Sequence, residues 1–248
     1  MKNNLIEVCT YSIQSAIIAQ AAGADRIELC HNIFEGGTTP SAATIQLVRK
    51  LLDINIHVMI RPRGSDFLYS ELEFQIMKRD IEIAKDLGID GVVFGILTDD
   101  GLIDEKRIGE LIRLSEPLST TFHRAFDVVK NPLLAIEQLI DLGINRVLTS
   151  GQQQTAMIGK DIIKELIDQF GNRIIIMPGS GINELNIQEL KNYTGANEFH
   201  LSGKSIIKSK MKFRNTLLKM SSTSNISEFE RYETDFITVK NVISKINF

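Results

Sequence analysis

The chain contains two cysteines, Cys9 and Cys30, and each one ends a short run of aliphatic residues. If both runs are strands, the two thiols share one face of neighbouring strands, which lie about 4.8 Å apart. Two thiols at that separation could ligate a soft ion such as Cu(I). A structural zinc site would need further ligands, such as His31 or His123. Alternatively, the two cysteines are small buried side chains without a ligand.

A second group of reactive side chains lies in residues 121–127. His123 is expected at the end of a strand and Asp127 in the loop beyond it, which suits general acid–base catalysis. Arg124 is near enough in sequence to stabilise developing charge. Alternatively, His123 is a core histidine whose hydrogen bonds are satisfied by the protein itself.

Two arginines, Arg61 and Arg63, flank a proline after another predicted strand. The extended backbone before proline could direct both guanidinium groups towards one anion. Alternatively, the two arginines pair with Glu28 and Asp66.

Three later loops combine glycine with serine, at residues 149–151, 178–181 and 202–204. Barrels often bind phosphate in the loops after strands seven and eight through backbone N–H groups. The alternative is that these loops are ordinary tight turns. We therefore predict substrate binding by Arg63, Arg124, Ser150, Gly151, Gly179, Ser180, Gly181, Ser202 and Gly203, with Glu28, Arg61, His123 and Asp127 as catalytic residues.

The elements that would position these residues alternate regularly between strand and helix. Eight strands are predicted at residues 5–9, 26–30, 56–61, 91–95, 120–124, 146–149, 173–178 and 198–201. Helices are predicted at 12–22, 41–52, 70–87, 104–114, 132–142, 161–170 and 184–192. Gly23, Gly88, Gly143 and Gly195 each end a helix directly before strand two, four, six or eight.

This alternation predicts an α/β fold, a single (β/α)8 TIM barrel over residues 1–248. Residues 1–204 would form the barrel core, and 205–248 an extension that is irregular until a final helix at 234–246. The competing open doubly wound sheet usually has a G-x-G-x-x-G turn after strand one, which Cys9-Thr10-Tyr11-Ser12 does not resemble. No nucleotide cofactor is expected.

Composition restricts the classes of partner. The net charge is −3 and the isoelectric point near 5.9, which argues against nucleic-acid and membrane-surface binding. No apolar run approaches the ~18 residues of a membrane helix. Two cysteines without a secretion signal favour a reducing compartment, so a cytoplasmic protein is expected.

Alternation along the strands places charged side chains inside the predicted barrel, where Val, Ile and Leu are usual. Buried charges must be paired, so these side chains should form a network. Those at strand starts, His57 and Glu198, are expected to be structural. The full inward set includes Glu7, Arg26, Glu28, His57, Arg61, His123, Glu198 and His200.

The sequence resembles the CutC family of copper-homeostasis proteins. The resemblance lies in residues 7–9, 24–30, 35–41, 59–64, 122–127, 146–151, 177–181, 198–200 and 211–215. It implies a cytoplasmic barrel, a homodimer or larger homo-oligomer, and copper-binding cysteines at Cys9 and Cys30. Ser65 and Ser180 stand where the family often has glycine, and residues 219–233 match poorly.

Two functions follow from these residues. The first is Cu(I) binding and copper homeostasis through Cys9 and Cys30. The second is an enzyme of unknown reaction (isomerase, lyase or hydrolase) that acts on a small phosphorylated or carboxylated metabolite.

Overall fold

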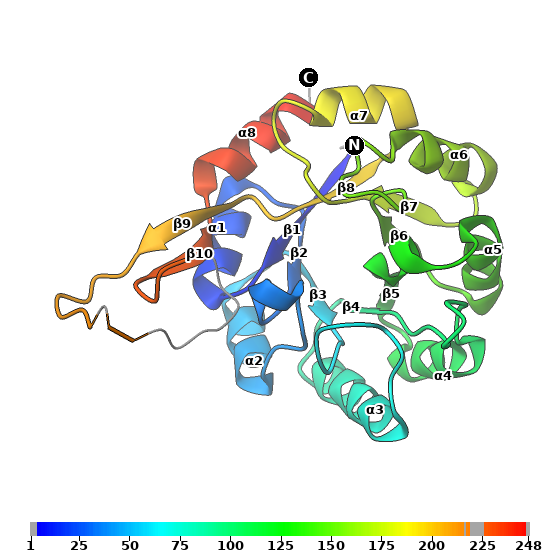
Figure 1. Ribbon diagram of the computed structural model, residues 1–248, viewed down its shortest axis with the longest axis horizontal. Helices are drawn as coiled ribbons and strands as arrows, with labels where there is room; N and C mark the ends of the chain where they lie inside the picture. Colours follow the sequence, from blue (N-terminus) through cyan, green and yellow to red (C-terminus); the bar gives the residue numbers. More distant parts are fainter. Residues whose placement is uncertain (1–3, 216, 219–225, 247–248) are drawn as a thin grey trace.

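The computed structural model describes residues 4–215, 217–218 and 226–246. Eight parallel strands form a cylinder surrounded by helices, which confirms the predicted TIM barrel (Figure 1). The strands are β1 (Leu5–Thr10), β2 (Arg26–Leu29), β3 (Asn55–Met59), β4 (Gly91–Phe94), β5 (Ser119–Phe122), β6 (Arg146–Thr149), β7 (Ile175–Pro178) and β8 (Glu198–Leu201).

The helices follow the predicted alternation. They are α1 (Ile13–Ala22), α2 (Ala42–Leu51), α3 (Glu71–Asp86), α4 (Glu105–Ser115), α5 (Pro132–Leu142), α6 (Lys160–Phe170), α7 (Ile187–Thr194) and α8 (Phe236–Ile246), with short 3-10 helices η1 (Ile33–Glu35) and η2 (Arg124–Val128). Gly23, Gly88, Gly143 and Gly195 have φ between +74° and +97°, the left-handed conformation predicted for a helix end before a strand.

The strands pair in the order β7-β6-β5-β4-β3-β2-β1-β8. The two outer members, β7 and β8, lie side by side and complete the cylinder without ladder hydrogen bonds between their described residues (Figure 1). Since β1 pairs with both β2 and β8, the beginning and the end of the barrel sequence meet at one place.

The apolar core lies between the cylinder and the helices. Outward-facing residues such as Val8, Ile27 and Val58 are fully buried against the helix layer. The alternate residues face the lumen, where charged side chains replace the usual aliphatic filling. The strand alternation predicted from the sequence therefore divides apolar packing outside the sheet from polar chemistry inside it.

The extension after residue 204 differs from the irregular segment that we predicted. Strands β9 (Lys204–Lys208) and β10 (Glu230–Thr234) form an antiparallel ribbon that projects beside the barrel (Figure 1). The ribbon is joined to α1 by a hydrogen bond from the Thr234 amide to Ser15 Oγ. Helix α8 then packs between α1 and α7, close to the predicted final helix. Each strand is too short and too exposed to show a strong alternation in sequence.

Within the part of the chain that the structure describes, every helix is too short or too polar to span a lipid bilayer.

Candidate functional site

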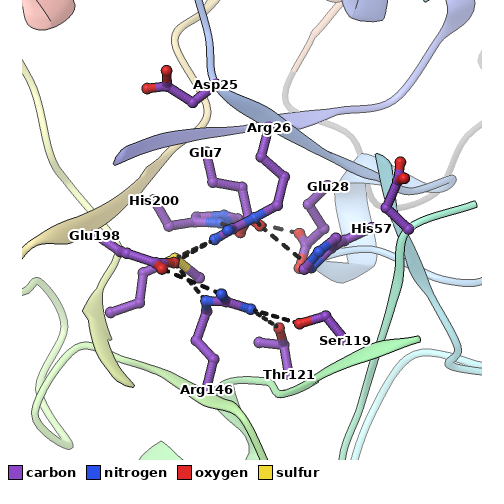
Figure 2. A network of polar contacts seen from close by, with 12 residues as sticks. Glu7, Asp25, Arg26, Glu28, His57, Ser119, Thr121, Arg146, Glu198 and His200 are labelled. Carbon is purple, nitrogen blue, oxygen red and sulfur yellow. Dashed lines mark hydrogen bonds and ion pairs between the residues drawn. The ribbon is translucent and has the colours of Figure 1, made fainter. Parts of the chain in front are cut away.

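The amino-terminal half of the lumen is filled by a paired charge network (Figure 2). Arg26 forms ion pairs with Glu7 and, at 2.7 Å, with Glu198. Arg146 Nε donates to the same Glu198 oxygen, Oε2, at 2.5 Å, and its Nη1 donates to Thr121. Two carboxylates and two guanidinium groups balance each other, which is the pairing that buried charges require.

Glu198, at its strand start, is paired within this network, and its second partner, Arg146, was not among the residues predicted to face inward. Arg146 begins β6 and pairs in register with Thr121 of β5 and Ile175 of β7. The alternation of side chains along β6 was the only pattern in the sequence that could have placed Arg146 on the inward face. A run as short as Arg146–Thr149 gives too few alternations to decide which residues face inward.

The two cysteines meet directly above this network. Their sulfur atoms lie 3.8 Å apart, and Cys30 Sγ lies 3.4 Å from Glu28 Oε2. Both thiols are buried and free, and they pack with Met59 and Val93. The register explains the contact, because Cys9 is paired with Glu28 and Cys30 follows two residues later.

The electrostatic environment distinguishes the two thiols. A hydrogen bond from Cys30, together with His200 and Tyr11, holds the pKa of Cys9 well below its usual value despite burial. Burial and the neighbouring Cys9 raise the pKa of Cys30. Burial also raises the pKa of Glu28, and the charge on Cys9 adds to this rise.

His200 connects the charge network to the thiols. Its Nδ1 lies 2.7 Å from Glu7 Oε1, and its Nε2 lies 3.9 Å from Glu28 Oε2 (Figure 2). Burial alone would lower the pKa of His200, but Glu28, Cys9 and Glu7 raise it well above the usual value. Within the described chain, two groups of donor atoms lie within 4.8 Å of each other: Cys9/Glu28/Cys30 and Glu7/Glu28/His200.

A cavity of about 520 Å³ lies over these residues at the carboxyl ends of the strands. Eight residues predicted for the site line it: Cys9, Glu28, Arg61, His123, Arg124, Ser180, Gly181 and Ser202. The lining also includes residues that we had not assigned to a site, among them Tyr11, Phe67, His200 and Lys204. Strand alternation had predicted that His200 faces inward, and this pattern could have assigned it to the site. Tyr11 and Phe67 lie beyond the ends of their strands, where alternation does not predict the direction of a side chain.

The other predicted site residues are not part of this lining. Arg63 donates to Glu73 at 2.6 Å and to Asp66, so the structure does not bring its guanidinium to an anion shared with Arg61. Of the two ion pairs given as the alternative, the structure contains Arg63–Asp66, but the described residues show no pair between Arg61 and Glu28. Cys30, Asp127, Ser150, Gly151, Gly179 and Gly203 are also outside the lining.

Asp127 organises the loop after β6. Its Oδ1 accepts hydrogen bonds from Thr149 Oγ1 at 2.6 Å and from the Ser150 amide at 2.9 Å. Its Oδ2 accepts from Arg124 Nε at 2.7 Å. These contacts direct the carboxylate towards the loop after β6, and Asp127 is not among the residues that line the cavity with His123, so its catalytic role stays a prediction.

His123 faces the cavity with one free ring nitrogen. Its Nδ1 accepts a hydrogen bond from the Ala125 amide at 3.1 Å, so Nε2 carries the proton in the neutral ring. Nε2 is buried and has no partner. Burial, followed by the positive charge of Arg61, lowers the pKa of His123 to about 3.

The fold and this geometry define a (β/α)8 barrel with a thiol pair and a polar cavity at the carboxyl ends of its strands. The chain belongs to the CutC family, whose sequence profile matches residues 4–205. A CutC family protein from Bacteroides thetaiotaomicron is 50% identical over 247 residues, covering 99% of both chains. The human copper homeostasis protein cutC homolog is 49% identical over 243 residues, covering 97% of this chain and 89% of its own. The crystal structure of CutC from Streptococcus agalactiae has a TM-score of 0.77 and 36% identity, covering 80% of this chain and 98% of that one.

Proposed function

We propose that this protein binds Cu(I) through Cys9 and Cys30 and serves copper homeostasis. The observation that carries the proposal is the 3.8 Å separation of two free thiols, of which Cys9 lines the cavity. Bonds from a metal ion to thiolate sulfur are about 2.3 Å long, so one ion could contact both atoms. Soft sulfur donors select Cu(I) over harder cations.

The surroundings of the thiols suit a singly charged soft ion. Met59 adds a thioether to the same small cluster, and Val93 closes it on the apolar side. Two thiolates and one Cu(I) carry a net charge of −1, and the neighbouring His200 offers a compensating positive charge. The human relative and the Streptococcus agalactiae protein carry names that connect them with copper, which supports the same role here.

Anaerobic titration of the reduced protein with Cu(I), against a competing chelator, tests the proposal. We expect one Cu(I) per chain for the wild type, and loss of that binding in the Cys9→Ser/Cys30→Ser variant. Val93→Ala is the matched control, because it disturbs the same cluster without removing a donor. Binding that survives in the double serine variant would contradict the proposal.

We further propose a cytoplasmic location. Two thiols 3.8 Å apart stay reduced, and available to Cu(I), only in a reducing compartment. The homo-oligomer that the family resemblance implies stays a prediction, and sedimentation of the purified protein would test it.

A further inference from the structure

Five buried side-chain nitrogen and oxygen atoms in the described part of the chain lack a hydrogen-bond partner. Three of them belong to residues that line the cavity: Glu28 Oε1, Arg61 Nε and His123 Nε2. Buried polar atoms are normally hydrogen-bonded, because a buried donor or acceptor without a partner loses its bonds to water and gains nothing in return. Their concentration at one cavity indicates a partner that is not part of the protein.

Arg61 is the first part of this site. It is 6% exposed, and its Nη atoms donate to the carbonyls of Glu35, Gly37 and Ser65 at 2.6 to 2.8 Å. These carbonyls fix the guanidinium, but no carboxylate of the described residues forms a salt bridge with it. Arg124 lines the same cavity and is neutralised by Asp127. Arg61 is thus a buried positive charge without a counter-ion among the described residues, an arrangement that is strongly destabilising if it is left uncompensated.

His123 supplies a second donor on the same wall. It is 3% exposed, and its contact with the Ala125 amide leaves Nε2–H pointing away from the backbone. The Phe67 ring contacts both groups: the Arg61 Cζ atom lies 5.1 Å from its centroid and the His123 ring 4.9 Å. Phe67 therefore holds the cation and the neutral N–H donor beside each other.

The Cu(I) site does not account for these two groups. A guanidinium and a protonated ring nitrogen donate hydrogen bonds and carry no free electron pair, so neither can ligate a cation. They would instead bind an oxyanion. Across the cavity, Ser180, Gly181 and Ser202 come from the loops after β7 and β8, where barrels commonly bind anionic groups. The volume of about 520 Å³ is in the usual range for small-molecule sites, roughly 300–1,000 Å³.

We propose that this cavity is a binding site for a small metabolite that carries a carboxylate or phosphate group, with the anionic oxygens on Arg61 and His123 Nε2. Arg61 and His123 are not among the proposed Cu(I) ligands, although Cys9 lines the same cavity, so either proposal can fail without the other.

Titration of copper-free, reduced protein with orthophosphate and, separately, with malonate tests the site, monitored by the imidazole ¹⁵N signals. We expect a saturable shift of His123 Nε2 with at least one anion, and none at His57. His57 is an internal control, since it is equally buried and also has an unpartnered nitrogen but lies outside the cavity. The preferred anion distinguishes a phosphate ligand from a carboxylate ligand.

Three substitutions test which residues bind the anion. His123→Asn keeps an acceptor for the Ala125 amide, as an N-cap residue requires, but its shorter side chain no longer places an N–H donor where the histidine has Nε2–H. We expect it to weaken anion binding at least about tenfold, as the loss of a hydrogen bond to a charged group should. His123→Gln carries its amide N–H donor one carbon farther from the backbone and should bind the anion more tightly than His123→Asn. Arg61→Lys keeps the charge but not the planar group, and should weaken binding as well.

Three results would overturn the proposal. The first is the absence of a saturable shift at about 10 mM of either anion, where even a millimolar site is filled. The second is equal affinity in the wild type and in folded His123→Asn. The third is loss of binding in the Cys9→Ser/Cys30→Ser variant, which would place the anion at the thiols instead.

Discussion

The two halves of the barrel lumen hold similar side chains in opposite electrostatic states. In the amino-terminal half, Arg26 and Arg146 share the carboxylate of Glu198, and Glu7 balances the remaining charge. In the carboxyl-terminal half, Arg61 has no carboxylate partner among the described residues, and His123 has an unused donor. A buried arginine therefore says little about function by itself; what distinguishes the two halves is whether the protein completes the hydrogen bonds.

Removing one member of the paired half should have the largest effect on stability. Arg26→Met would leave both Glu7 and Glu198 short of a positive partner inside the barrel. Breaking a buried pair by removing one side costs about 3–5 kcal/mol. Urea denaturation of the variant should show this loss in the free energy of unfolding. Arg79→Met is the control, because Arg79 forms only a surface pair with Glu82, worth about 0–1 kcal/mol. Equal effects of the two substitutions would contradict a structural role for the network.

Asp127→Asn should have a smaller effect, confined to the rim of the cavity. The substitution keeps the shape but weakens hydrogen bonds from Thr149, Ser150 and Arg124. We expect a loss of about 2 kcal/mol, as for one or two hydrogen bonds to a charged group. Amide exchange should accelerate in the loop after β6, whereas Cu(I) binding should not change. A variant as stable as wild type would mean that Asp127 is not the organiser of that loop.

The two halves can also be compared by the pH dependence of the free energy of unfolding, because each half contains one buried histidine. Burial lowers the pKa of His57, in the paired half, and of His123, in the cavity, to about 3 each. Unfolded histidine titrates near pH 6.5, so between about pH 6.5 and 3 the unfolded chain binds more protons than the folded one. Stability is therefore retained above pH 6.5 and falls as the pH decreases, by about 1.4 kcal/mol per pH unit for each histidine.

His200 contributes to the pH dependence of stability with the opposite sign, because its raised pKa adds stability at low pH. Substituting His57 and His123 one at a time separates their contributions from that of His200. His57→Gln and His123→Gln should each flatten the decrease in unfolding free energy between pH 6.5 and 5.5. Denaturant midpoints measured at pH 7.0, 6.0 and 5.5 would check this. A slope that is unchanged in both variants would show that neither histidine is held neutral by burial.

The barrel and the thiol contact could be predicted because local patterns determine both. The helix–glycine–strand repeat at Gly23, Gly88, Gly143 and Gly195 marks four helix ends in turn, and alternation from Glu7 to Cys9 and from Glu28 to Cys30 fixes the inward faces. These features depend on backbone geometry within a few residues.

The features that sequence reasoning missed depend on contacts between distant segments. The direction of Arg63 is decided by Glu73, at the start of α3, and that of Asp127 by the loop after β6. The β9–β10 ribbon joins segments that are separated by more than twenty residues. Nothing in the residues around Arg63 or Asp127 distinguishes a side chain that points into the cavity from one that turns away.

The pairing of β1 with β8 has a consequence for the order of events during synthesis. Glu7 bonds to His200 across 193 positions, and Arg26 bonds to Glu198 across 172. Until the eighth strand leaves the ribosome, Arg26 and Arg146 lack their shared carboxylate, and contacts over such separations form late in folding. A nascent chain that ends before Glu198 would thus keep its first strand at an open edge, which is prone to association with other chains. Closure of the ring and completion of the site at Cys9 are consequently expected to occur in the same late step.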